Sequence, residues 1–260
     1  MDEKQESFVG SVEGKVCIVT GGAGSIGLAS VRALLAEGAK VMLVDCKEAE
    51  LKRAVEDISG SSVDFAVADV TKAEQVRNYV ARTVDRFGKI DVLFSNAGND
   101  GPLMPITEYP EDLFDSIIAT HIRGGFLACK YVIPQMNDGG SIILTSSIVG
   151  VKGVPGNCSY VAAKHGLMGL MRCVAREVAP RGIRVNTVNP GPIDNEFMRT
   201  AERSMSQLLG REAGQFFDDQ IPLGRHGKPD EVAQAVVFLA SNASSYVSGS
   251  ALMVDGAFCA

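Results

Sequence analysis

The chain has 260 residues, of which 46% are hydrophobic and 22% charged, and its formal net charge is −6. This length and composition are typical of one large α/β domain with a substantial core. The acidic balance disfavours nucleic acid or an anionic membrane as a partner, because either would favour a basic face.

Residues 1–10 are polar and acidic, and they lack the apolar segment of a secretion signal. We therefore expect a short tail at residues 1–12 and a cytoplasmic protein. No apolar run reaches the roughly 18 residues that a membrane-spanning helix needs. The six cysteines form no C-x-x-C pair and do not combine with the three histidines at metal-ligand spacing, so no metal site is predicted.

Short apolar runs alternate with helical patterns along the whole chain. Strands are predicted at residues 15–20, 40–45, 63–68, 90–95, 141–145, 183–188 and 251–254. Helices are predicted from the first glycine turn to residue 37, and at residues 47–58, 72–87, 111–135, 157–179, 195–220 and 229–240. This alternation predicts a Rossmann-type, doubly wound parallel sheet of seven strands with helices on both faces. With no linker or internal repeat, residues 1–260 are expected to form a single domain.

The first predicted strand leads directly into G-G-A-G-S-I-G at residues 21–27, and a helix follows. A glycine turn between a strand and a helix aims backbone N–H groups at a phosphate. The second strand ends in Asp45, 18 residues after Gly27, where a carboxylate can accept hydrogen bonds from a ribose diol and repel a 2′-phosphate. Lys47 is the nearest cation and no arginine lies beside Asp45. These features favour NAD over NADP as the cofactor.

Tyr160 and Lys164 are four residues apart, so they share one face of a helix. A phenol with a pKa of about 10 is a poor acid or base near neutrality, and a nearby ammonium lowers that pKa. The pair is then suited to exchanging a proton with an alcohol, whose oxygen a nearby Ser147 hydroxyl could hold. This spacing alone is common on helix surfaces. It gains weight because the glycine turn, Asp45 and Ser147 all follow strands and converge on one sheet edge.

On its motifs, the chain resembles the short-chain dehydrogenase/reductase family over nearly its full length. The motifs are T-G-G-A-G-S-I-G (20–27), D-V (69–70), N-A-G (96–98), S-S (146–147), Y-V-A-A-K (160–164), N-P-G-P-I (189–193) and V-D-G (254–256). The resemblance implies that Tyr160 is the acid/base, that Ser147 orients the substrate oxygen, and that Lys164 binds the nicotinamide ribose and lowers the Tyr160 pKa.

The resemblance also implies a set of cofactor-binding residues and a homotetramer. The expected contacts are Gly21, Ser25, Ile26 and Gly27 at the pyrophosphate, Asp69 and Val70 at the adenine, Asn96 and Gly98 at the adenine-side ribose and its loop, and Ile193 at the nicotinamide amide, with Pro190 in the same motif. The tetramer is expected to form through the helices at 111–135 and 157–179 and the C-terminal segment.

Three positions depart from the family pattern. Ser25 takes the place of the middle glycine of the turn, and Asn195 stands where a threonine that contacts the nicotinamide amide is common. His121 stands where the family usually has an asparagine that supports a water relay from the lysine. It either fills the helix as a satisfied polar residue or takes over the relay with an imidazole that can carry a proton.

The walls of the substrate site are expected at residues 99–105 and 149–157 and in a lid at about 194–220. Their apolar side chains are Leu103, Met104, Val149, Val151, Val154, Met198, Met205, Leu208, Leu209, Phe216 and Phe217. These suit a small hydrophobic secondary alcohol or ketone, unless they pack the lid against the body instead. A looser resemblance to bacterial cyclic-alcohol and levodione-type reductases, in E-Y-P-E-D (108–112), G-G-F-L-A-C-K-Y (124–131) and G-N-C-S-Y-V-A-A-K-H-G (156–166), implies a cyclic or terpenoid alcohol.

The sequence therefore predicts NAD-dependent, reversible oxidation of such an alcohol to its ketone. One alternative is a 3-oxoacyl-thioester reductase, which Asp45 and the net charge of −6 disfavour. The other is a nucleotide-binding protein without turnover, which the presence of both Tyr160 and Lys164 disfavours.

Overall fold

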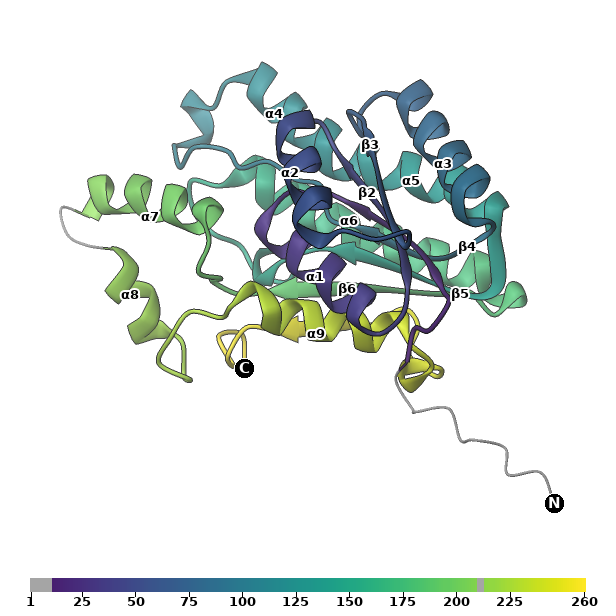
Figure 1. Cartoon of the computed structure of the whole chain (residues 1–260). Coiled ribbons are helices and arrows are strands. Elements are labelled where there is room, and N and C mark those ends of the chain that lie inside the picture. Colours follow the sequence, from purple (N-terminus) through teal and green to yellow (C-terminus); the bar gives the residue numbers. More distant parts are fainter. Residues whose placement is uncertain (1–10, 210–212) are drawn as a thin grey trace.

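The centre of the molecule is one sheet of seven strands in the order β3–β2–β1–β4–β5–β6–β7 (Figure 1). The structure is a computed structural model that describes residues 11–209 and 213–260. All neighbouring strands are parallel, which confirms the predicted doubly wound, Rossmann-type sheet. The strands are β1 (Val16–Thr20), β2 (Lys40–Asp45), β3 (Val63–Val67), β4 (Ile90–Ser95), β5 (Met136–Thr145), β6 (Arg184–Pro190) and β7 (Ala251–Val254).

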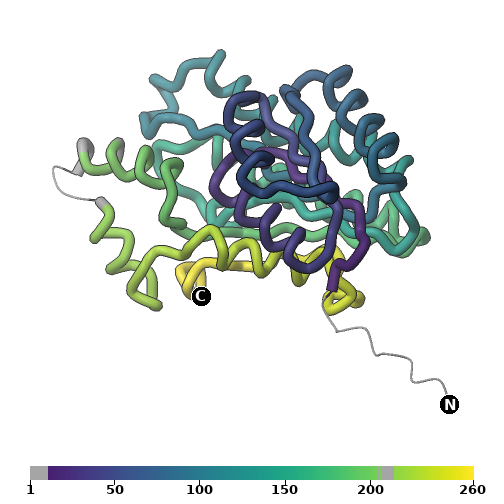
Figure 2. The backbone as a smooth tube through the Cα atoms, in the orientation of Figure 1, coloured from purple at the N-terminus to yellow at the C-terminus, as the bar shows by residue number. Residues whose placement is uncertain are grey.

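Helices cover both faces of this sheet (Figures 1 and 2). One layer contains α1 (Ser25–Ala36), α2 (Glu48–Ile58) and α9 (Pro229–Ala240), and the other contains α3 (Ala73–Phe87), α5 (Gly124–Val132) and α6 (Cys158–Val178). Successive side chains of a strand point to opposite faces, so β1 places Cys17 and Val19 in the first core and Ile18 in the second. Continuous apolar strands are what a sheet buried on both faces needs.

The α6 helix contributes its apolar stripe to the core of this chain. Leu167, Met171 and Val174 are buried, and Leu170 packs beside them while partly exposed. None of the helices in the described ranges is both long and apolar enough to cross a membrane.

The N-terminal segment joins the core earlier than the predicted tail of residues 1–12 allows. Val12 is fully buried among the residues of the α1–α9 layer. The Gly14 N–H donates to the Gly38 carbonyl at 2.9 Å, which ties this segment to the end of α1. Residues 1–10 of the predicted tail lie outside the described part of the chain.

The single helix predicted at residues 111–135 is interrupted. It consists of α4 (Glu111–Ile118), a π-helical turn (Ala119–Arg123) and α5, and β5 then begins at Met136 rather than at residue 141. A π-helical turn inserts an extra residue and so redirects the side chains on it; such turns often occur at functional sites. Here it contains His121. The early start of β5 includes a register shift against β4 between Ile90 and Val92, which no local pattern indicates.

The predicted lid consists of α7 (Glu196–Leu209) and α8 (Ala213–Gln220), which extend to one side of the sheet (Figures 1 and 2). Asn195 caps α7, since its side-chain oxygen accepts a hydrogen bond from the Met198 N–H at 2.8 Å. Asn195 thus has a structural role at the start of the lid.

Candidate active site

The segments that the motifs singled out follow the carboxyl ends of six neighbouring strands. They are the glycine turn after β1, Asp45 at the end of β2, Asp69 after β3, Asn96 after β4, Ser147 after β5 and Pro190 at the end of β6. Because β1 lies between β2 and β4, successive connections leave the sheet in opposite directions at this point. Such a switch point opens a crevice in which α/β proteins bind ligands.

The glycine turn has the close backbone approaches that a phosphate cradle requires. Gly21 has φ +64°, and a Cβ there would lie 2.9 Å from the Ala97 Cα of the loop after β4. A Cβ on Gly27 would overlap the Gly21 carbonyl. Ser25, at the position of the missing glycine, is the exposed first residue of α1 and does not disturb the turn. The free N–H groups at the start of α1 therefore fit a pyrophosphate.

Asp45 is held beside this turn by two backbone hydrogen bonds. Its Oδ2 accepts from the Ala23 N–H at 3.2 Å, and its Oδ1 accepts from the Lys47 N–H at 3.2 Å. No ion pair to Asp45 forms among the described residues. A fixed, unneutralised carboxylate at this place suits a ribose diol and repels a 2′-phosphate.

The residues predicted near the adenine and its ribose line the same edge. Asp69 accepts the Thr71 N–H at 2.9 Å, and the buried Val70 packs against α5. Asn96 also has a structural role. Its side chain accepts a hydrogen bond from the Thr145 hydroxyl at 3.1 Å and donates one to the Gly21 carbonyl at 3.4 Å. The amide thus joins the glycine turn to β5.

The N-P-G-P-I motif at residues 189–193 closes the other end of the crevice. Ile193 is buried and forms an isolated bridge with Gly227, while the Gly191 N–H donates to the Val254 carbonyl at 3.0 Å. The Asn189 side chain donates to the Ser147 carbonyl at 2.9 Å. The segment that begins at Pro190 is therefore fixed to β7 and to the loop that carries Ser147.

Ser147, Tyr160 and Lys164 come together at the centre of this edge. Lys164 is buried, its Nζ donates to the Thr145 carbonyl at 2.8 Å, and Nζ lies 5.1 Å from the centroid of the Tyr160 ring. The Ser147 hydroxyl hydrogen-bonds the Tyr160 phenol and accepts from the Val149 N–H at 3.3 Å. Helix α6 therefore brings the predicted acid/base and its lysine to the serine at the end of β5.

Burial dominates the electrostatics of the Tyr160–Lys164 pair. Burial raises the pKa of Tyr160 above its usual value, and the nearby Asp100 carboxylate raises it further, while the hydrogen bond from Ser147 acts the other way. Burial also lowers the pKa of Lys164 to about 7. The same burial disfavours the ammonium and the phenolate alike, so any lowering of the Tyr160 pKa by Lys164 does not outweigh burial in this structure.

His121 is buried beside Tyr160, and the two ring centroids are 5.3 Å apart. Its Nε2 lies 2.9 Å from the Asn99 carbonyl oxygen and 3.3 Å from the Asn99 nitrogen, so the tautomer decides whether Nε2 donates or accepts. Its Nδ1 is buried without a hydrogen-bond partner in the described part of the chain. Burial and the Lys164 charge lower the His121 pKa to about 3, so the ring is neutral.

Gly98, one of the predicted cofactor residues, lies directly against this histidine. A Cβ at Gly98 would lie 2.6 Å from His121 Cε1, closer than side-chain carbons normally approach. The loop after β4 and the π-helical turn are therefore packed directly against each other. No hydrogen bond links His121 to Lys164 within the described ranges.

The lid presents a side chain that sequence reasoning missed. Phe197 lies against Tyr160 with ring centroids 5.9 Å apart, and it is 40% exposed. In contrast, Phe216 and Phe217 contact each other edge to face, with centroids 5.8 Å apart, and Phe217 also contacts His226. These two predicted wall residues thus pack inside the lid. The side chains of Leu208 and Leu209, also predicted as wall residues, lie outside the described set.

The remaining predicted wall residues divide by exposure. Val149 is buried, Val151 is largely exposed, and Leu103, Met104, Val154, Met198 and Met205 are partly exposed. Nothing in the sequence pattern distinguishes Phe197 from its apolar neighbours, since the distinction comes from the direction in which α7 leaves β6.

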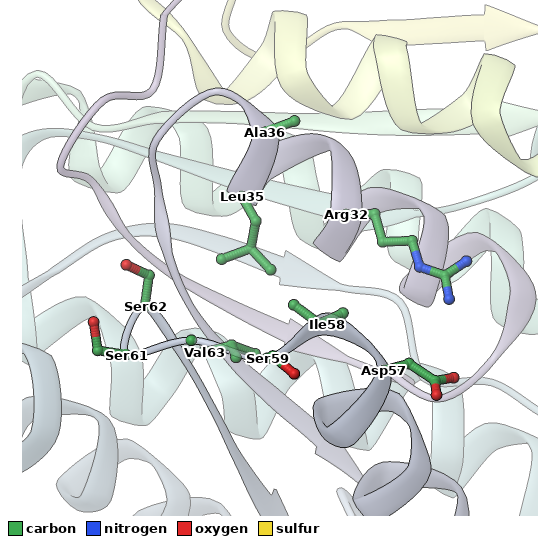
Figure 3. Close-up of a pocket in the computed structure, with 10 residues that line it drawn as sticks. Arg32, Leu35, Ala36, Asp57, Ile58, Ser59, Ser61, Ser62 and Val63 are labelled. Atoms are coloured by element: carbon green, nitrogen blue, oxygen red, sulfur yellow. The ribbon is translucent and has the colours of Figure 1, made fainter.

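A separate surface hollow lies at the opposite edge of the sheet (Figure 3). It is lined by the ends of α1 and α2 and the start of β3, including Arg32, Asp57 and Ser59. Because α1 ends and β3 begins at the amino edge, this hollow is remote from Tyr160. No group of three or more His, Cys, Asp or Glu suited to holding a metal occurs among residues 11–209 and 213–260.

A glycine-lined phosphate cradle at the switch point, with a tyrosine–lysine pair on the neighbouring helix, places this protein among the dinucleotide-dependent oxidoreductases. The family profile described as "Enoyl-(Acyl carrier protein) reductase" matches residues 21–258. Together with the relatives below, this match shows that the chain belongs to the short-chain dehydrogenase/reductase family, whose members bind a nicotinamide cofactor.

Three curated relatives and one solved structure illustrate the range of the similarity. The 3-oxoacyl-[acyl-carrier-protein] reductase of Thermotoga maritima is 39% identical, covering 94% of this chain and 98% of the relative. The 2,5-dichloro-2,5-cyclohexadiene-1,4-diol dehydrogenase of Sphingobium indicum is 38% identical, covering 96% and 98%. The crystal structure of levodione reductase has a TM-score of 0.89 at 35% identity, covering 94% and 97%; the levodione reductase of Leifsonia aquatica is 36% identical in sequence.

Proposed function

We propose that this protein is a cytoplasmic, NAD-dependent dehydrogenase that reversibly oxidises a small, largely hydrophobic cyclic secondary alcohol, such as a terpenoid alcohol, to its ketone. The main support for this proposal is Asp45, whose carboxylate is held beside the glycine turn at 3.2 Å from the Ala23 nitrogen. A carboxylate at this place favours the ribose diol of NAD over the 2′-phosphate of NADP. Two relatives named for ring substrates, a cyclohexadiene-diol dehydrogenase and a levodione reductase, support the substrate class.

The proposed chemistry divides one alcohol oxidation between a proton and a hydride. The nicotinamide, when bound, supplies the acceptor for the hydride of the carbinol carbon. Tyr160 accepts the hydroxyl proton as a phenolate, and Ser147 holds the substrate oxygen through its hydroxyl. Lys164 binds the nicotinamide ribose and, as an ammonium, stabilises the phenolate. Phe197 covers the phenol and helps to exclude water.

The remaining predicted residues would hold the cofactor along the crevice. The proposed contacts are Gly21, Ser25, Ile26 and Gly27 at the pyrophosphate, Asp45 at the adenosine ribose, Asp69 and Val70 at the adenine, Asn96 and Gly98 at the adjoining loop, and Pro190 and Ile193 at the nicotinamide. We assign His121 a positioning role, because its Nε2 is engaged by the Asn99 backbone and its low pKa, about 3, keeps the ring from taking up a proton near neutral pH.

A screen that follows NADH absorbance tests this function directly. Cyclic, terpenoid, steroid and sugar alcohols would each be offered with NAD and with NADP. We expect turnover of cyclic alcohols with NAD, and Tyr160→Phe should lose about 10²- to 10⁴-fold in kcat, the range typical of general acid–base catalysis. Tyr246→Phe is the matched control, because that side chain is fully exposed. A strong preference for NADP, or full activity of Tyr160→Phe, would contradict the proposal.

Reduction of a 3-oxoacyl thioester is the second candidate, favoured by the 39% identity to an enzyme named for that reaction. A partner of acidic carrier proteins benefits from a basic surface, whereas this chain has a net charge of −6. Oxidation of NADPH with acetoacetyl-coenzyme A as substrate separates the two. Faster turnover of that thioester than of any cyclic ketone would favour the reductase.

We also propose a homotetramer built through α4, α5 and α6 and through the C-terminal segment. Aromatic side chains that are partly exposed on these helices support it, namely Phe114 on α4 at 36% and Phe126 on α5 at 44%. Association would remove this apolar surface from water. Size-exclusion chromatography with light scattering measures the mass, and a monomer at micromolar concentration would contradict the proposal.

A further inference from the structure

Asp100 lies in the loop after β4, and the residues on both sides of it are held close to Tyr160 by contacts with other segments. On one side of Asp100, the Asn99 backbone is hydrogen-bonded to the His121 ring at 2.9 Å. His121 in turn packs against Tyr160. Asp100 is therefore anchored on this side to the element that supports the phenol.

The other side of Asp100 is anchored through the residue that precedes Tyr160. Ser159 and the Tyr109 hydroxyl share a hydrogen bond of 2.6 Å. Gly101 lies so close to this pair that a Cβ there would collide with the Tyr109 hydroxyl. The position of Asp100 is thus set by contacts on both sides, unlike that of an acid on a free surface loop.

The Asp100 carboxylate is only partly used by the protein itself. One oxygen, Oδ1, accepts the Gly101 N–H at 2.8 Å. No ion pair and no other side-chain hydrogen bond of Asp100 forms among the residues that the structure describes. The residue is half-buried, and burial raises the pKa of its carboxyl group.

This placement is unfavourable for the chemistry unless the carboxylate has a partner. The Asp100 charge raises the pKa of Tyr160 and so opposes the phenolate that abstracts a proton. A partly desolvated charge also loses hydration that only a hydrogen-bond donor or a cation restores. The effect on Tyr160 and the loss of hydration both become smaller when a bound molecule donates a hydrogen bond to the second oxygen of the Asp100 carboxylate.

Building on the proposed function, we propose that Asp100 is a specificity-determining residue that accepts a hydrogen bond from a second hydroxyl group of the substrate. The substrate class is then a ring diol or a hydroxy-ketone rather than a simple cyclic alcohol. A hydroxyl is the donor that fits the proposed substrate class, because it can bind the free carboxylate oxygen without bringing a second charge into the partly buried site. Phe197, which packs on Tyr160, provides the apolar wall for the ring.

The test compares two substrates that differ by one hydroxyl group. The kcat/KM values with NAD are measured for cyclohexanol and for cyclohexane-1,2-diol, in both cis and trans forms, with the wild type, Asp100→Ala and Asp100→Asn. We expect the wild type to prefer a diol. Asp100→Ala should reduce the diol-to-alcohol ratio about tenfold or more, as expected for a hydrogen bond to a charged group. Asp100→Asn should retain part of the preference, because an amide oxygen still accepts.

The matched control is Glu108→Gln, an exposed acid on the same connection between β4 and α4, which should keep the wild-type ratio. An equal diol-to-alcohol ratio in the wild type and Asp100→Ala would overturn the assignment of Asp100 and leave the proposed function standing. A greater preference for 2-aminocyclohexanol than for the diol would overturn the assignment of a hydroxyl.

Calorimetry separates the failure of this inference from the failure of the proposed function. Absence of turnover with every ring alcohol would contradict the proposed function. The binding of cyclohexane-1,2-diol to the NAD-loaded enzyme would then be titrated. Tighter binding to the wild type than to Asp100→Ala supports the assignment of Asp100, and equal or undetectable binding to both overturns it.

Discussion

The rings of His121 and Tyr160 meet at nearly right angles, with an interplanar angle of 86° and centroids 5.3 Å apart. The same imidazole holds the Asn99 backbone through Nε2. His121 thus couples the catalytic phenol to the loop that carries Asp100. The π-helical turn makes this contact possible, because it directs the histidine towards the loop after β4.

Replacing His121 by alanine should disturb substrate positioning without removing an ionisation from the pH profile. We expect kcat/KM for the alcohol to fall roughly tenfold, mainly through KM, because losing a buried hydrogen bond of this kind costs about 1–3 kcal/mol. The ring is neutral, with a pKa of about 3, so the limbs of the profile should stay in place. His165→Ala, at an exposed histidine of α6, is the control. If a limb of the pH profile moves or disappears in His121→Ala or His121→Asn, the result would favour a proton relay through His121.

The shifted pKa values of Lys164 and Tyr160 predict opposite pH dependences for the two reaction directions. Lys164 has its pKa lowered to about 7 and Tyr160 has its pKa raised, so above about pH 7 the pair holds one proton in total. Oxidation starts from the state of the pair with one proton, in which Tyr160 is a phenolate and Lys164 an ammonium. Reduction starts from the state with two protons, in which Tyr160 is a phenol and Lys164 an ammonium. We therefore expect kcat/KM for oxidation to rise, and for reduction to fall, as pH rises through about 7.

Measuring both directions with the same alcohol and ketone pair checks this prediction. Lys52→Gln, which alters an exposed lysine of α2, should leave both curves unchanged. Oxidation and reduction curves that rise or fall together would show that the Tyr160–Lys164 pair does not control them.

Removing the Asp45 carboxylate should relax the choice of cofactor. Asp45→Ala loses both the acceptor for a ribose diol and the charge that repels a 2′-phosphate. We expect the ratio of kcat/KM for NAD to that for NADP to fall roughly 10- to 100-fold, which corresponds to about 1.4–2.7 kcal/mol. Asp57→Asn, at the hollow on the opposite edge of the sheet, serves as the control. An unchanged ratio would mean that Asp45 does not face the adenosine ribose.

The glycine turn predicts a steric limit at Gly27. A Cβ there would overlap the Gly21 carbonyl, so Gly27→Ala should open the turn, lower the stability by about 1–3 kcal/mol and weaken NAD binding. Gly169→Ala is the matched change, because a Cβ at this helical glycine meets no atom within 4 Å. It should raise stability by up to about 1 kcal/mol. Thermal unfolding with and without NAD measures both; equal melting temperatures for the two variants would refute the steric limit.

The sequence predicted the sheet well because its determinants are local. Each apolar run, glycine turn and helix pattern is contained in a few neighbouring residues, and the parallel topology then brings Asp45, Ser147 and Tyr160 to one edge. No local pattern predicted the π-helical turn, which brings His121 into contact with Gly98 of another segment.

The pKa shifts could not be predicted from the sequence for a related reason. Spacing alone shows that Lys164 can reach Tyr160, but the burial that shifts both pKa values is a property of the assembled crevice. Phe197 and Asp100 have no motif, so only the courses of α7 and of the loop after β4 identify them. Residue types at fixed spacing thus indicated the reaction, while substrate contacts required the tertiary structure.

The lid should loosen when His226 is removed. His226 lies between its two helices, with Nδ1 at 2.7 Å from Asp218 Oδ1 of α8 and Nε2 at 3.0 Å from Glu202 Oε1 of α7. The first contact is a hydrogen bond, whereas the second is close in distance but lacks hydrogen-bond geometry. His226→Ala removes this bridge and the ring contact with Phe217.

Because α7 carries Phe197 over Tyr160, we expect His226→Ala to raise the KM for the alcohol about three- to tenfold, the effect of losing about 1 kcal/mol, with a smaller change in NADH affinity. Hydrogen exchange should accelerate in α7 and α8 alone. Arg203→Ala is the control, since its ion pair with Glu196 stays within α7. Equal exchange rates in His226→Ala and the wild type would show that other contacts hold the lid.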